Sequence, residues 1–107
     1  MRRLAIITLA ATLIAAAPAD TLKSKIRSHL DTVLLDGQSA RYIWPEVKSP
    51  RVYCGFVNAK NRLGGYTGYR LFYVQTNGSP IKATFDSDTL ALASMVCDEA
   101  GYPLSPA

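Results

Sequence analysis

The sequence predicts a small α+β domain in which a three-stranded antiparallel meander lies between two helices in the chain. Apolar residues recur at helical spacing near both ends of the domain, and alternating runs joined by short turns lie between them. Two cysteines fall within this pattern. Short hairpin connections imply antiparallel neighbours with both helices on one face of the sheet. We therefore expect two layers, in the order helix, three strands, helix, closed by one disulfide.

Residues 1–19 are expected to be a signal peptide. A pair of arginines precedes an uncharged apolar run from Leu4 to Ala17, and the small residues of Ala17-Pro18-Ala19 suit a signal peptidase. We place cleavage before Asp20, which leaves residues 20–107 as a single domain. A membrane anchor is disfavoured, because a spanning helix needs roughly 20 apolar residues and this run is shorter. The predicted localisation is periplasmic or secreted, without stable membrane insertion after cleavage.

The charge of the domain does not indicate a nucleic-acid partner. Removal of the signal leaves ten of the twelve basic residues against all eight acidic ones. Nucleic-acid binding usually shows as a clustered basic stripe on a strongly basic domain. We therefore expect no nucleic acid among the partners.

Cys54 and Cys97 are expected to form a disulfide. An even number of cysteines in a small exported domain favours a bridge, and closing a loop of about 43 residues stabilises by about 4 kcal/mol in the chain-entropy model. Two buried thiols are the alternative. A zinc site is disfavoured, because two cysteines and the distant His29 do not complete a ligand set.

Residues 20–35 read as the first helix. Asp20 or Thr21 is placed to cap its start, and Gly37 suits a left-handed position just after its end. Its apolar stripe consists of Leu22, Ile26, Leu30, Val33 and Leu34. Lys23, Lys25 and Arg27 lie toward the other side, as a solvated face or as a docking surface for an anionic partner.

Three strands follow, over residues 52–57, 66–75 and 81–85. Residues 58–65 connect the first two, and Asn77-Gly78 is a strong turn signal before the third. Gly68 inside the second strand indicates a bulge or a close backbone approach. Before these strands, residues 39–44 could form a short extended piece that ends at Pro45, with Trp44 covering the core edge.

The last helix is expected from Ser87 or Asp88 to Ala100, with Asp86 to Asp88 capping its start and Gly101 ending it. Its inward stripe consists of Leu90, Ala93, Cys97 and Ala100. Cys54 shares its strand face with Val52 and Phe56. A bridge between the cysteines would pin this helix to the first strand.

No catalytic, metal or cofactor site is legible in the sequence. His29 lies at the edge of the first helix's stripe, where a histidine is usually structural, and no serine or cysteine stands in a nucleophile context. The glycine-rich stretch Gly64–Tyr69 matches neither phosphate-binding pattern and precedes a strand instead of a helix. We predict no catalytic residues, no metal and no cofactor.

Binding is the better hypothesis, and the connection at residues 58–69 is the candidate surface. It combines amides and cations with two aromatic rings, which suits recognition of a protein loop, a peptide or a glycan. The candidate binding residues are Asn58, Lys60, Asn61, Arg62, Tyr66 and Tyr69. The alternative is that the two asparagines only cap their own turn and the tyrosines only pack across strands.

The central stretch resembles a motif of small exported bacterial proteins of uncharacterised function, roughly C-G-x-V-N-x-K-N-x-x-G-G-Y-x-G-[FY]-x-x-F. Residues Cys54–Asn61, Gly64–Tyr69 and Phe72 carry the likeness. An upstream segment similar to L-x-D-x-x-S-A-[RK]-[FY] is matched at Leu34–Tyr42. The resemblance implies export and brings no established activity. Phe56 occupies a position where the motif favours a polar residue, which indicates a buried face.

The sequence thus predicts a small secreted or periplasmic binding module. Its expected partner is an envelope protein, a peptide or cell-wall glycan, bound through the 58–69 loop. The alternative is an envelope hydrolase or other enzyme with a site around the same loop.

Overall fold

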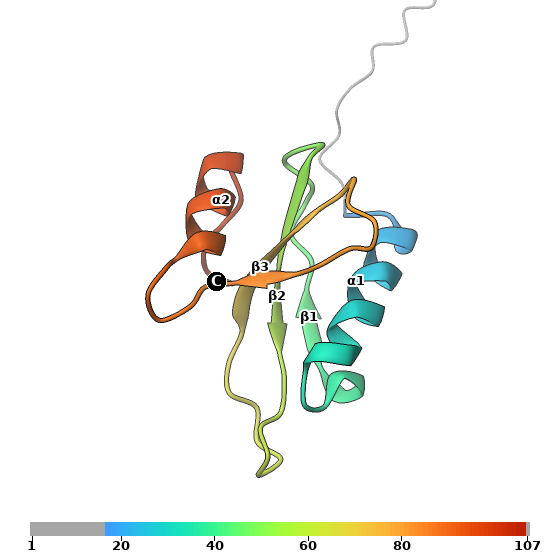
Figure 1. Ribbon diagram of the computed structural model, residues 1–107, viewed down its shortest axis with the longest axis vertical. Helices are drawn as coiled ribbons and strands as arrows, with labels where there is room; N and C mark the ends of the chain where they lie inside the picture. The colour runs from blue at the N-terminus through green and yellow to red at the C-terminus, as the bar shows by residue number, and fades with distance from the viewer. Residues whose placement is uncertain (1–16, 107) are drawn as a thin grey trace, which may run out of the picture.

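Two helices and a four-stranded antiparallel sheet make up the fold (Figure 1). The computed structural model of the chain describes residues 17–106. In chain order the elements are α1 (Asp20–Val33), a 3-10 turn η1 (Gly37–Ser39), β1 (Arg41–Ile43), β2 (Val52–Asn58), β3 (Arg70–Gln75), β4 (Thr84–Phe85) and α2 (Leu92–Ala100). The sheet order is β1-β2-β3-β4, so each strand pairs with its neighbour in sequence. The α+β class and the meander are confirmed.

The prediction of three strands is wrong, because β1 adds a fourth. Tyr42 pairs with Val57, and Ile43 pairs with Phe56. The sequence indicated an extended piece here, but three residues are too few for a visible alternation of apolar and polar positions. Their pairing with β2 makes them a strand.

The two predicted strands after β2 are shorter than expected. β3 begins at Arg70, because Gly68 has a left-handed φ of 105° and its N–H is bonded to the Asn58 side chain instead of a neighbouring strand. β4 comprises only Thr84 and Phe85. Ile81 precedes β4 and is still buried in the core.

The helices lie on opposite sides of the sheet, which corrects the predicted two layers to three (Figure 1). Cys54 of β2 is bonded to Cys97 of α2, so its side of the sheet faces α2. Tyr42 pairs with Val57 and therefore projects to the other side, where Arg27 of α1 lies 5.5 Å from its ring. All residues from Tyr53 to Val57 are buried, as expected for a central strand covered on both faces.

Helix α1 packs through the predicted stripe but lacks the predicted caps. Ile26 and Leu30 are fully buried, whereas Val33 at the end of the helix is 54% exposed. Ala19 precedes the first turn, and no side chain caps the helix start. Gly37 is not left-handed. A Cβ atom there would lie 2.5 Å from the Asp31 Cα atom, so glycine is needed for a close approach to α1.

Helix α2 begins at Leu92, later than predicted. Ser87 instead closes a turn, in which its Oγ accepts the N–H of Leu90. The Asp86 carboxylate accepts hydrogen bonds from the Ser94 N–H and hydroxyl, so it caps the helix from eight residues upstream. These bonds lower the pKa of Asp86. Gly101 ends the helix with a φ of 89°, as predicted.

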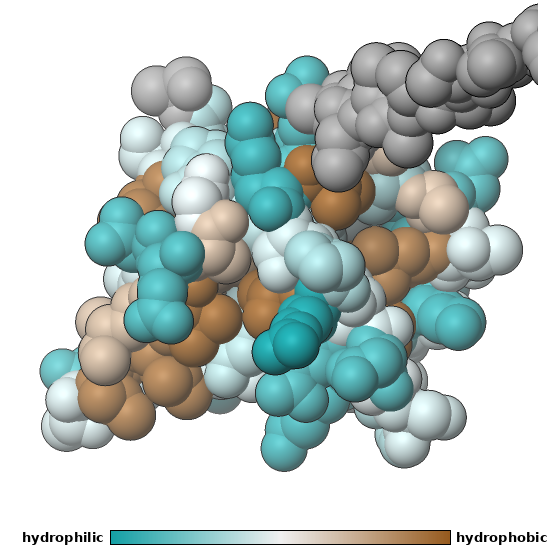
Figure 2. All heavy atoms as spheres, turned by 90° about the horizontal axis from the view of Figure 1, so that it is seen from above, coloured by the Kyte–Doolittle hydropathy of each residue, from teal (hydrophilic) through white to brown (hydrophobic). Residues whose placement is uncertain are grey.

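The disulfide between Cys54 and Cys97 is confirmed, and both residues are fully buried. The Cα atoms are 6.1 Å apart, within the range that a bridge requires. On the same face of the sheet, Leu71 and Tyr73 of β3 pair with Phe56 and Cys54. On the outer surface of this side, Leu90 and Met95 are more than half exposed, and Figure 2 shows apolar side chains gathered where α2 lies.

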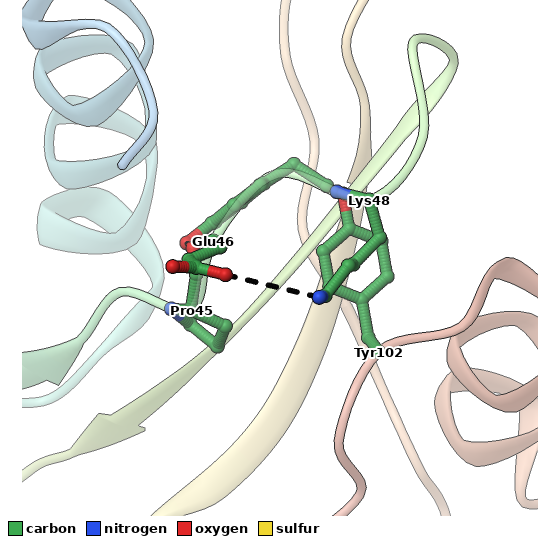
Figure 3. A network of polar contacts seen from close by, with 5 residues as sticks. Pro45, Glu46, Lys48 and Tyr102 are labelled. Atoms are coloured by element: carbon green, nitrogen blue, oxygen red, sulfur yellow. Dashed lines mark hydrogen bonds and ion pairs between the residues drawn. The ribbon is translucent and has the colours of Figure 1, made fainter. Parts of the chain in front are cut away.

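The C-terminal segment is tied to the connection between β1 and β2 (Figure 3). The Tyr102 hydroxyl donates to the Val52 carbonyl at 2.7 Å and accepts the Lys48 N–H at 3.0 Å. Tyr53 donates to the Pro45 carbonyl at 2.6 Å. The Lys48 ammonium lies 3.8 Å from the Glu46 carboxylate, and the dashed line in Figure 3 marks this ion pair. Burial, with Tyr102 adding to it, raises the pKa of Tyr53.

One sequence prediction concerns residues that lie mostly outside the described part of the chain. The expected signal peptide begins there, since the structure describes residues 17–106. Within that range, no helix combines the length and apolar character that crossing a bilayer requires.

Candidate functional site

The 58–69 connection is an exposed extension of the β2–β3 hairpin. Its turn projects away from both helices (Figure 1), and Leu63 at its tip is 94% exposed. A bridge between Lys60 and Tyr66 continues the pairing beyond β2. The predicted site therefore lies at the surface, where a partner can reach it.

Both asparagine oxygens of the loop are used by the loop itself. Asn61 Oδ1 accepts the N–H groups of Leu63 at 2.9 Å and Gly65 at 3.1 Å. Asn58 Oδ1 accepts the N–H of Gly68 at 3.0 Å. These bonds hold the glycine-rich turn in shape. The two oxygens thus play the structural role that the sequence left open as an alternative.

The base of the loop is joined to the segment before β1. The Tyr66 hydroxyl donates to the Ser39 carbonyl at 2.9 Å. The Arg41 guanidinium stacks on the Tyr66 ring at 4.1 Å from its centroid, and the Lys60 ammonium lies 5.6 Å from the same centroid. The half-buried Tyr66 therefore brings two cations together.

Apart from the two asparagines, the predicted site residues fall into two groups. Lys60 and Tyr66 belong to the organised base, together with Arg41. Arg62 is exposed at the tip, and Tyr69 is 37% exposed on the approach to β3. Neither of these two takes part in the cation–ring contacts around Tyr66. The base and the tip are therefore distinct candidate surfaces.

A second set of stacked cations lies where α1 crosses β1. The Tyr42 and Trp44 rings are parallel, with centroids 4.9 Å apart. The Arg27 guanidinium lies 5.5 Å from the Tyr42 centroid and 5.6 Å from that of Trp44, and the Lys23 ammonium lies 5.7 Å from Trp44. Sequence reasoning missed this set. Its signal was the four-residue spacing of the cations and the two-residue spacing of the rings.

A groove of about 630 Å³ lies between α1 and β1. It is lined by Arg27, Ser28, Asp31, Gly37, Gln38, Ala40, Arg41 and Tyr42. We call it the α1–β1 groove. Burial raises the pKa of Tyr42 and outweighs the opposing effect of Arg27, while Asp31 adds to the rise. Two guanidinium groups and one carboxylate give the groove a positive balance.

Among the described residues, the two arginines of the groove form no ion pair within 4.0 Å. Between residues 17 and 106, the contact of Lys48 with Glu46 is the one ion pair within 4.0 Å. Arg27 and Arg41 are therefore held by aromatic rings and not by carboxylates. Asp36 lies near the base, where the Ser39 hydrogen bond lowers its pKa and Lys60 contributes. In the same range, no group of three or more metal-ligating side chains was found.

Comparisons of this chain with protein-family models, curated proteins and solved structures found no match.

Proposed function

We propose that this protein is a small exported binding module that recognises acidic groups on a protein partner in the cell envelope. The surface is made of cations stacked on aromatic rings at β1, α1 and the base of the 58–69 loop. Its members are Lys23, Arg27, Arg41, Tyr42, Trp44, Lys60 and Tyr66. We call it the cation–aromatic surface. The contact of Arg41 with Tyr66 at 4.1 Å is the observation that carries the proposal.

Stacking prepares an arginine for binding a carboxylate. A guanidinium has five N–H donors in its plane, and a ring beneath it occupies one face while leaving the donors at the edge. The ring also restricts the side chain, so less conformational entropy is lost when a partner binds. Since Arg41 has no carboxylate within 4.0 Å among the described residues, those donors suit an acidic group from outside.

A protein partner fits this surface better than a glycan does. Sugars that bind to aromatic residues need open ring faces. Here Arg41 covers one face of Tyr66, and Tyr42 and Trp44 cover each other. The surface therefore presents positive charge and hydrogen-bond donors, which suit acidic side chains of a protein.

Export is part of the proposal. The disulfide is consistent with an oxidising compartment, and the sequence before Asp20 has the features of a signal peptide. Mass spectrometry of the exported protein should show an N-terminus at Asp20. An intact N-terminus would contradict cleavage without affecting the surface.

Affinity capture from an envelope extract tests the binding role. We expect the immobilised protein to retain a partner that elutes with salt, since exposed charges are screened. Arg41→Ala and Tyr66→Ala should each reduce the captured amount strongly, whereas Arg51→Ala, a matched change at an exposed arginine elsewhere, should not. Circular dichroism of each variant controls for folding.

Two results would contradict the binding role. One is capture that is equal for all variants or does not depend on salt. The other is turnover of an envelope substrate that is lost with Lys60→Ala or Arg62→Ala, which would favour the enzyme instead.

A further inference from the structure

We propose that the α1–β1 groove receives an extended acidic segment of the partner, which adds to the sheet beside β1 and places two adjacent acidic side chains against Arg27 and Arg41. This inference rests on the proposed binding function and specifies the chemistry and shape of the ligand. It follows from the position of β1 in the sheet, the placement of the two arginines and the charge of the groove.

The outer side of β1 is a sheet edge. β1 is the first strand in the sheet order, and among the described residues it pairs only with β2. An edge strand presents backbone N–H and C=O groups outward, and an extended peptide satisfies them by adding a strand. The α1–β1 groove is lined by residues of both β1 and α1, so a segment bound there would have α1 beside it.

The two arginines approach this edge from opposite sides of the sheet. Arg41 is paired with Asn58 and projects to the side where Tyr66 lies beneath its guanidinium. The neighbouring Tyr42 projects to the other side, beneath Arg27 of α1. Successive side chains of a strand alternate in the same way. Adjacent residues of an added strand would therefore point one to each arginine.

This geometry specifies the acidic pattern of the ligand. Two acidic residues next to each other reach both arginines, whereas two acidic residues separated by one point to the same side. The groove contains one carboxylate of its own, Asp31, and it forms no ion pair within 4.0 Å with either arginine. The arginines therefore remain available, and the net charge of the groove is complementary to an acidic segment.

Three peptide probes test the inference. Each is a ten-residue peptide of alternating Thr and Val: the first has Glu-Glu at its centre, the second has Glu-Thr-Glu, and the third has Gln-Gln. The disulfide-bonded, isotope-labelled protein is titrated with each peptide at low salt and followed by NMR. We expect the Glu-Glu peptide to shift the amide signals of residues 40–43. It should bind severalfold more tightly than the Glu-Thr-Glu isomer and about tenfold more tightly than the Gln-Gln peptide.

Backbone methylation tests the added strand directly. Two versions of the Glu-Glu peptide are N-methylated at alternate residues, one at even and one at odd positions. An added strand uses the N–H groups of every second residue toward its neighbour, so one version should lose binding and the other should keep it. Arg27→Ala and Arg41→Ala should each lower the affinity for the Glu-Glu peptide about tenfold. Arg51→Ala, the matched control, should not.

Several results would overturn the inference. A short, charged edge strand also serves to discourage pairing, and failure of all three peptides to bind would assign β1 that role. Equal effects of the two methylation patterns would exclude strand addition. Displacement of the peptide by an acidic oligosaccharide such as oligogalacturonate would indicate a glycan site, and self-association through the same amides would indicate a second copy as the occupant.

The envelope capture separates the two proposals. If the peptides fail while Arg41→Ala still abolishes capture, strand addition is wrong and the binding module stands. If Arg41→Ala leaves capture unchanged as well, both are wrong.

Discussion

The two sides of the sheet are held in different ways. On one side, α2 is joined to β2 by the Cys54–Cys97 bridge, and Ala93 and Cys97 face the core. On the other side, α1 has no covalent link and contacts the sheet through Ile26 and Leu30, with cations stacked on rings at its margin. The covalent link lies on the α2 side. The stacked cations lie around β1, with Arg27 on the α1 side and Arg41 on the face that Asn58 shares with Cys54.

The largest effect should come from breaking the α2 side. Replacing both cysteines, Cys54→Ala with Cys97→Ala, should lower the free energy of unfolding by about 4 kcal/mol, because the bridge closes a separation of 43 residues. Thermal unfolding with and without reductant measures this change, and hydrogen exchange locates it. Amides of α2 should lose protection before those of α1. An unchanged melting temperature on reduction would contradict the stabilising role of the bridge on the α2 side.

A core truncation on the α1 side should come next. Leu30→Ala removes a fully buried side chain and should cost about 3 kcal/mol. Val33→Ala in the same helix is the matched control, since Val33 is 54% exposed, and it should cost well under 1 kcal/mol. Denaturant unfolding gives both values. Equal costs would mean that α1 does not pack as the structure places it.

Alanine substitutions at two glycines compare the stability cost of a change beside α1 with that of a change at the loop tip. Gly37→Ala would place a Cβ atom 2.5 Å from the Asp31 Cα atom, and overpacking of this kind costs about 1–3 kcal/mol. Gly64→Ala meets open space but keeps a φ of 83°, so it should cost about 1 kcal/mol from backbone strain alone. Unfolding of the two variants, with the Glu-Glu peptide titrated against each, separates the effects. Only Gly37→Ala should also disturb the groove.

The smallest effect concerns the cap of α2 and depends on pH. Hydrogen bonds from Ser94 lower the pKa of Asp86 below its ordinary value of 3.8. The stabilisation is therefore present above that value and is lost as the pH falls through the folded-state pKa. Asp86→Asn should lower the melting temperature at pH 6, and the difference from the natural protein should shrink toward pH 3. A difference that grows on acidification would reverse the sign and contradict the cap.

Local patterns in the sequence were sufficient for much of the fold. The periodicity of Ile26 and Leu30 identified α1, and the left-handed Gly101 marked the end of α2. The inward faces of Cys54 and Cys97 identified the bridge. Each of these features depends on residues that are close in the chain, or on a cysteine pair with no competing partner.

The cation–aromatic surface was determined by tertiary structure. The sequence pointed to Lys60 and Tyr66, but Arg41 joins them through contacts between distant segments: it pairs with Asn58, and the Tyr66 hydroxyl bonds the Ser39 carbonyl 27 residues away. The strand β1 is three residues long and exists through pairing with β2, which no local pattern encodes. The side of the sheet that each helix covers was likewise set by packing. Periodicity shows that a face is buried, whereas the element that covers it is chosen by contacts between distant segments.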